Sequence, residues 1–226
     1  MIYVIDQQKA FWDLISVFEE LGLLSHVMLI GSWAEYIYQF HMQSGFQANL
    51  RTRDTDFLYM NLNKPKGRNI DITAKLKEKG FLFTTDYQTG ITKFVKEDLL
   101  ELSFLTRAFG EGKQVYEIPS LKIKAEGLRS INMLAEYPME VNTSAFEIGQ
   151  DDFVLVVPEP EAYIVQKLLI NPERKPMYKK EKDIEGIRGL LPYVNVNRLQ
   201  EIFNSLTEKQ KIAVVQTKKK HFIDFI

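Results

Sequence analysis

At residues 26–40 the sequence reads HVMLIGSWAEYIYQF. Its first five residues are mostly apolar, and a short run of this kind is typical of a buried strand. From Trp33 to Phe40 the large apolar residues recur at steps of three and four, which favours an amphipathic helix. The change of pattern at Gly31-Ser32 therefore predicts a turn that connects a buried strand to the start of a helix.

A second informative stretch, at residues 52–58, reads TRDTDFL. Side chains two positions apart on a strand point to the same face, so Asp54 and Asp56 are expected to project together. Thr55 and Phe57 then turn to the opposite face. Two adjacent carboxylates repel each other unless a cation lies between them, so the pair predicts a metal site.

The Gly31-Ser32 turn is suited to bind the phosphates of a metal-triphosphate complex. A glycine lets the backbone approach a phosphate closely, and the start of a helix offers unpaired N–H groups with a favourable dipole. A lone Gly-Ser is usually only a turn, and a lone Asp-x-Asp is usually a solvated edge or a cap. The order strand, Gly-Ser, helix, loop, Asp-x-Asp strand is more specific, and it predicts a site for a Mg²⁺ nucleoside triphosphate.

The rest of the chain divides into a mixed α/β part and a helical part. The expected α/β elements are a helix capped by Asp6 that ends at Leu21, a helix at 69–79, strands at 81–85, 91–95 and 99–105, and short strands between 110 and 157. After Pro158 the pattern is helical, at 159–170, 178–191, 196–205 and 207–223, the last with a capping box from Thr207 and Gln210. We expect two domains, residues 1–157 and 158–226.

Composition excludes several classes of protein. Lys and Arg (29) nearly balance Asp and Glu (30), so the net charge does not favour binding to nucleic acid or to an anionic membrane. The chain has no cysteine, which rules out disulfides, thiolate metal sites and cysteine nucleophiles. No run approaches the ~20 apolar residues of a membrane span, and the amino terminus lacks a signal-peptide pattern. We expect a cytoplasmic protein that does not bind membranes.

Taken in order, these motifs resemble those of the DNA polymerase β-like nucleotidyltransferase superfamily. More narrowly, the chain is similar to a bacterial branch of uncharacterised proteins with a long spacing between Gly-Ser and Asp-x-Asp. The matching pieces are LIGSWAEYIY at 29–38, TRDTDFL at 52–58, LELSFLT at 100–106, VPEPEAYIVQKLL at 157–169 and KEKDIEGI at 180–187. The resemblance implies a mixed sheet with carboxylates on neighbouring strands, and transfer of a nucleoside monophosphate from a triphosphate to an acceptor hydroxyl.

The resemblance also implies a third carboxylate on an adjacent strand, which completes the metal site and takes the acceptor proton. Strand alternation places Glu101 and Ser103 on one face, so Glu101 is the candidate beside Asp54 and Asp56. Relatives often carry an acid where Ser103 stands, and a shift of two residues moves the origin of the charge by about 6.6 Å. Glu101 as an exposed strand residue therefore remains an alternative.

In the resembling proteins, a Lys and a following Lys-Asp pair of the helical part face the cleft. Here these are Lys167, which would contact phosphates together with Lys182, and Asp183, which would orient the base. Cations neutralise the charge of phosphates during transfer. The basic residues around Arg174 and Lys179 also fit a solvated helix entrance.

The leading hypothesis is an enzyme that uses Mg²⁺ or Mn²⁺ and a nucleoside triphosphate, with ATP as the expected donor. Its acceptor could be a small molecule, a protein side chain or an RNA end. The alternative is a catalytically weak nucleotide-binding or protein-interaction module, such as one partner of a toxin-antitoxin or defence pair. A nucleic-acid-binding protein would need a continuous basic stripe, which the balanced charge disfavours. Trp33 is expected to pack in the core rather than to stack on a base.

Overall fold

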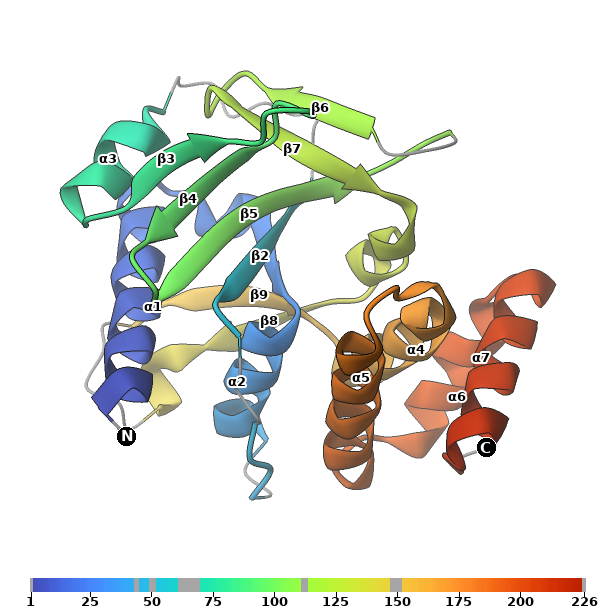
Figure 1. Ribbon diagram of the computed structural model, residues 1–226. Helices are drawn as coiled ribbons and strands as arrows, with labels where there is room; N and C mark the ends of the chain where they lie inside the picture. The colour runs from blue at the N-terminus through green and yellow to red at the C-terminus, as the bar shows by residue number, and fades with distance from the viewer. Residues whose placement is uncertain are drawn as a thin grey trace.

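The structure, a computed structural model, describes residues 2–42, 45–48, 52–60, 70–110, 114–146 and 152–224, without the side chains of residues 2–5 and 145. Figure 1 shows a twisted sheet with α1 along one side and a group of helices from the carboxy-terminal part on the other. The fold is a mixed α/β arrangement followed by helices, which confirms the predicted fold class. Within these ranges, every helix is too short or too polar to cross a membrane.

The helices follow the predicted pattern closely. They are α1 (Ile2–Glu20), α2 (Ser32–His41), α3 (Ile72–Glu78), α4 (Pro160–Ile170), α5 (Met177–Leu190), α6 (Val196–Ser205) and α7 (Glu208–His221). The predicted capping box is present, because Thr207 accepts a hydrogen bond from the Gln210 N–H and the Gln210 side chain accepts one in return from the backbone of Thr207.

The start of the first helix was predicted wrongly. Helix α1 begins at Ile2, so Asp6 lies inside the helix instead of capping it. The Asp6 side chain is exposed there, and an exposed aspartate inside a helix costs only a few tenths of a kcal/mol relative to better helix formers. Residue 69, the expected start of the helix at 69–79, lies outside the described residues, and Asp71 caps α3 by accepting from the N–H of Ala74.

The strands form one large mixed sheet and a small second sheet. They are β1 (Val27–Ile30), β2 (Asp54–Tyr59), β3 (Leu82–Thr85), β4 (Thr92–Lys96), β5 (Leu100–Arg107), β6 (Gln114–Ile118), β7 (Ile123–Leu128), β8 (Pro138–Asn142) and β9 (Val154–Pro158). The large sheet has the order β1-β2-β5-β4-β3, with β7 on β5 and β6 on β7. Strand β2 is antiparallel to β1 and parallel to β5. The first residues of β2 and β5 therefore lie at the same end of the sheet.

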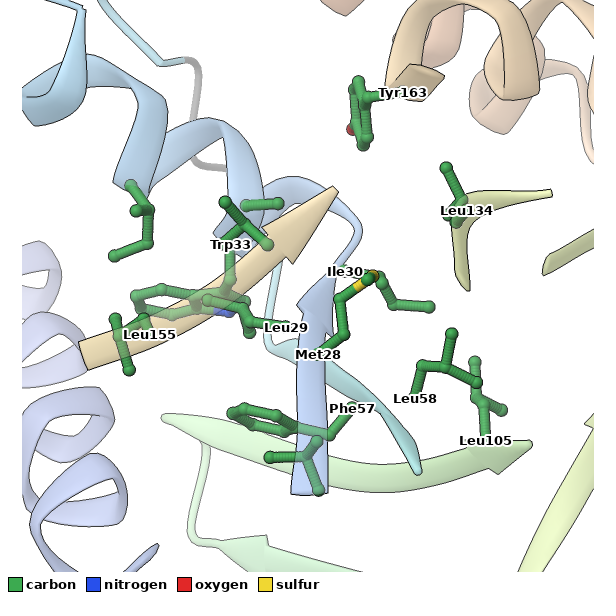
Figure 2. Close-up of a cluster of buried hydrophobic side chains, with 14 of the residues drawn as sticks. Met28, Leu29, Ile30, Trp33, Phe57, Leu58, Leu105, Leu134, Leu155 and Tyr163 are labelled. Carbon is green, nitrogen blue, oxygen red and sulfur yellow. The ribbon is translucent and has the colours of Figure 1, made fainter. Parts of the chain in front are cut away.

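A single hydrophobic core joins these elements. Phe18 of α1 packs at a tilt against Phe57 of β2 and stacks on Phe104 of β5, with ring centroids 4.8 and 5.9 Å away. Figure 2 shows side chains of β1, β2 and β5 gathered with Leu155 of β9 and Tyr163 of α4. The core thus continues across residue 158, the predicted boundary between the two parts of the chain.

Candidate active site

The turn at Gly31 is built for close approach. Gly31 has a φ of +71°, a conformation that glycine adopts at little cost and other residues rarely adopt. It immediately precedes α2, so the turn predicted from the sequence is present. A Cβ atom at Gly31 would lie 3.8 Å from Oδ2 of Asp56. The start of α2 and the acidic strand therefore face each other directly.

Strand register explains this approach. In the antiparallel pair β1–β2, Ile30 lies opposite Asp56, so the residue after Ile30 is brought to the acidic side chains. Along β2, Thr55 and Phe57 are buried while Asp54 is exposed and Asp56 half-buried. Both carboxylates thus project from one face, as alternation along a strand requires.

Asp56 occupies an unfavourable place for a negative charge. Burial, and after it the neighbouring Asp54 charge, raise the pKa of the Asp56 carboxyl from its ordinary 3.8 to about 6. Lys167, Lys179 and Lys93 oppose the shift but do not cancel it. A divalent cation between the two carboxylates would supply the missing positive charge.

Glu101 lies on the neighbouring strand but is engaged elsewhere. In the parallel pair β2–β5, Asp54 lies opposite Glu101 and Asp56 lies opposite Ser103. The Glu101 carboxylate forms an ion pair with Lys93 of β4. Within the described ranges, no three His, Cys, Asp or Glu side chains come close enough together to hold a metal ion. Glu101 therefore shares a cavity wall with the Asp pair, and its role as third ligand stays a prediction.

Asp183 organises the basic side chains. Lys167 Nζ of α4 donates to Asp183 Oδ1 at 2.6 Å, and Arg174 Nε donates to Oδ2 at 3.1 Å. Asp183 is buried, and both of its oxygens are occupied by these cations. The described contacts of Asp183 hold Lys167 and Arg174 in place, while a contact with a base stays a prediction.

Lys182 lies among charges of both signs. Burial lowers the pKa of its ammonium group, with Lys167 acting in the same direction, and Glu35, Asp54 and Asp183 raise it. A cation whose neighbours include another cation gains from an added anion, which favours phosphate binding here. The role of Lys167 and Lys182 as phosphate ligands stays a prediction.

Two adjoining cavities meet at the acidic pair. The helix-side cavity has a volume of about 600 Å³, and the sheet-side cavity about 510 Å³. Both are lined by Gly31, Asp54, Asp56, Lys167, Arg174 and Lys179. Ser32, Lys182 and Asp183 line only the helix-side cavity, whereas Glu101 and Ser103 line only the sheet-side cavity. The geometry thus offers two compartments that share a pair of carboxylates.

The sequence analysis did not identify two polar residues, Glu35 and Gln7, whose hydrogen bonds hold together the elements around the site. Glu35 of α2 is buried and accepts a 2.5 Å hydrogen bond from the Tyr163 hydroxyl of α4. Burial raises the pKa of the Glu35 carboxyl, although this hydrogen bond and Lys167 act against the shift. Gln7 of α1 donates to the carbonyls of Thr52 and Leu99, at 2.7 and 3.0 Å, and so ties together the segments that enter β2 and β5. At Glu35 the sequence signal was a glutamate that stands between apolar and aromatic residues of α2.

Comparisons with known proteins concern the family and the fold of the chain. A family model described as nucleotidyltransferase matches residues 9–211, most of the chain. The fold is similar to an antigenic nucleotidyltransferase-like protein from Paracoccidioides brasiliensis, with a TM-score of 0.56 and 18% identity, covering 95% of this chain and 88% of that one. It is also similar to the antibiotic-resistance factor ANT(2'')-Ia, with a TM-score of 0.50 and 15% identity, covering 96% and 98%. No curated protein sequence matches the chain significantly.

Proposed function

Since the chain belongs to the nucleotidyltransferase family, we propose that it transfers a nucleoside monophosphate from a Mg²⁺ nucleoside triphosphate to an acceptor hydroxyl. The observation that carries the proposal is the Asp54–Asp56 pair facing the Gly31 turn, with lysines of α4 and α5 on the opposite wall. ATP is the proposed donor, and Mn²⁺ is the proposed substitute for Mg²⁺.

The carboxylates fit a hard divalent cation. Mg²⁺ is bound through one or two carboxylates together with substrate phosphates and water. Asp54 and Asp56 provide two such oxygen ligands on one face, and the raised pKa of Asp56 marks a carboxylate short of positive charge. A cation bound there would polarise the α-phosphate and neutralise charge on the leaving pyrophosphate.

The two cavities fit the stereochemistry of transfer. Ser32, Lys182 and the start of α2 line the helix-side cavity, so we place the β- and γ-phosphates there. In phosphoryl chemistry the attacking and leaving oxygens lie roughly in line, so the acceptor must enter from the opposite side. We assign that side to the sheet-side cavity, which Glu101 and Ser103 line. Lys167 and Lys179, which line both cavities, would contact the α-phosphate between them.

The acceptor proton needs a base in the sheet-side cavity. The acceptor oxygen would bond to the α-phosphorus as the bond to the pyrophosphate oxygen breaks, and the hydroxyl proton would pass to a carboxylate. Glu101 lines that cavity and would serve once its carboxylate leaves Lys93.

The function is tested by incubating the protein with α-phosphate-labelled triphosphates, Mg²⁺ or Mn²⁺, and a cell lysate. We expect label to move to an acceptor, and Asp54→Ala to abolish this transfer. Asp152→Ala is the matched control, because Asp152 is an exposed acid outside both cavities. Absence of transfer, together with absence of any metal-dependent thermal shift by a triphosphate, would overturn the proposal.

One observation favours a second candidate, a nucleotide-binding module with little catalytic activity. The Lys93–Glu101 ion pair occupies the expected third carboxylate, and Ser103 stands opposite Asp56 without an acid. Such a module would bind a Mg²⁺ triphosphate and transfer no label to any acceptor, with a protein partner as its proposed target. Measuring binding and transfer on the same preparation separates the two functions.

A further inference from the structure

Tyr178 lines the helix-side cavity with a solvent-exposed aromatic ring. Its side chain is 64% exposed. Among the described residues that line either cavity, the other aromatic side chains are Phe104 and Tyr163. Both are 1% exposed or less, and the Tyr163 hydroxyl is bound to Glu35. The ring of Tyr178 is therefore the aromatic surface in these walls that a flat ligand can cover.

The position of Tyr178 on α5 relates this ring to the phosphate-binding residues. Tyr178 and Lys182 are four residues apart on α5, so their side chains lie on the same face, about 6 Å apart along the helix axis. Lys182 interacts electrostatically with Asp54, which places it at the acidic end of the cavity. Helix α5 thus offers a cation beside the metal site and, one turn earlier, an aromatic ring.

The wall opposite α5 is held close to it. A Cβ atom at Gly186 of α5 would lie 2.7 Å from Oε1 of Glu35 of α2. Figure 1 shows α2 and α5 as neighbouring helices below the sheet. Ser32 at the start of α2, where we place phosphates, and Tyr178 at the start of α5 line the same cavity.

We propose that the ring of Tyr178 stacks on the nucleobase of the bound triphosphate. The inference rests on the proposed function and adds the site for its base. Stacking on an aromatic ring tolerates every base, because each base has a π-face. Stacking on Tyr178 therefore predicts that ATP, GTP, CTP and UTP all bind. The larger purine bases would cover more of the ring than the pyrimidine bases.

The test compares two ligands by isothermal titration calorimetry in Mg²⁺. One is ATP, and the other is inorganic tripolyphosphate, which has the phosphates without a base. Tyr178→Ala is expected to weaken ATP binding by about fivefold to a hundredfold, the range of base stacking on aromatic side chains, and to leave tripolyphosphate binding unchanged. Tyr178→Phe, which keeps the ring, is expected to bind ATP like the unmodified protein.

Met177→Ala is the matched control for folding and for the helix start. Met177 is the adjacent residue of α5, is 65% exposed, and lines neither cavity. It should alter the binding of neither ligand. Equal ATP affinity in Tyr178→Ala and the unmodified protein would overturn the inference, as would an equal loss for ATP and tripolyphosphate.

These outcomes are separable from failure of the proposed function. If the unmodified protein transfers label and Tyr178→Ala does so with an unchanged KM for ATP, only the stacking inference falls. If the unmodified protein binds neither ATP nor tripolyphosphate in Mg²⁺, the proposed function and the inference fall together.

Discussion

Gly31 and Asp56 face each other so closely that a Cβ atom on Gly31 would lie 3.8 Å from Oδ2 of Asp56. This distance is an ordinary van der Waals contact, so the methyl group of an alanine fits without collision. It would, however, fill the space between the helix start and the acidic strand. A metal-bound phosphate must enter that space if the proposed function holds.

Gly31→Ala is expected to weaken Mg²⁺-ATP binding at least tenfold while it destabilises the fold by about 1 kcal/mol. The stability cost comes from the positive φ of +71°, which disfavours an L-residue with a side chain. Gly45→Ala is the matched control, since Gly45 has a φ of +84° and no atom within 4 Å of the added Cβ. It should show a similar stability cost in urea unfolding and normal ATP affinity. Equal affinity losses in both variants would show that strain alone is responsible.

Asp56→Asn is expected to stabilise the ligand-free protein at pH 7.5 by about 1–3 kcal/mol while it abolishes transfer. The folded pKa of Asp56, about 6, lies above the ordinary value of 3.8, so folding favours the protonated form. The free energy of unfolding then falls as pH rises from about 4 through about 6. The uncharged amide removes this cost. Urea unfolding at pH 5 and pH 7.5 measures it, with Asp152→Asn as control.

The affinity for Mg²⁺-ATP should depend on the ionisation of Asp56. Mg²⁺ requires ionised Asp56, so Mg²⁺-ATP affinity is expected to fall as pH decreases below about 6. A flat affinity between pH 7.5 and pH 5 would contradict the assignment of Asp56 to the metal, and a destabilised Asp56→Asn protein would contradict its raised pKa.

Glu101→Gln is expected to lower the transfer rate about 100-fold or more, because it removes the proposed base. Ser103→Asp in the same chain should restore part of the rate. Ser103 lies opposite Asp56, so the new carboxylate would project beside the acidic pair. Transfer of labelled nucleotide measures both effects. A rate that Glu101→Gln leaves unchanged would remove Glu101 from the mechanism and return it to the role of a partner for Lys93.

Gly186→Ala is expected to destabilise the protein by about 1–3 kcal/mol, although alanine is the better helix former. The new methyl carbon would lie 2.7 Å from Oε1 of Glu35, so either this carboxylate must leave the Tyr163 hydroxyl or α5 must move away from α2. Gly189→Ala on the same helix is the control, since its Cβ would meet Phe46 at 3.8 Å. That variant should be neutral or more stable by up to about 1 kcal/mol. Thermal unfolding of both distinguishes crowding at Glu35 from a general effect of glycine in α5.

Local patterns in the sequence were sufficient for the turn at Gly31 and the acidic strand. Both depend on short-range rules: the change from an apolar run to helical spacing, and alternation along a strand. The family model confirms the resemblance built on them, and the mixed sheet confirms the predicted fold class. The same local rules failed at Asp6, because a good capping residue is also tolerated inside an exposed helix face.

Contacts between segments that are distant in sequence could not be predicted by such local rules. The Lys93–Glu101 pair joins β4 to β5, and Asp183 holds side chains that come from α4 and from the loop before α5. Glu35 and Tyr163 are 128 residues apart in the chain, yet they share a buried hydrogen bond. Nothing near either residue in sequence indicates this partner.

By itself the sequence determined the kinds of elements, their order and the face that Asp54 and Asp56 share, since each of these follows from the spacing of neighbouring residues. The tertiary structure alone decided the strand register that sets Gly31 against Asp56, the partner of Glu101, and the exposure of Tyr178 within a cavity. The physical reason is that register, ion pairing and solvent exposure depend on which distant surfaces pack together. The spacing of neighbouring residues does not determine that packing.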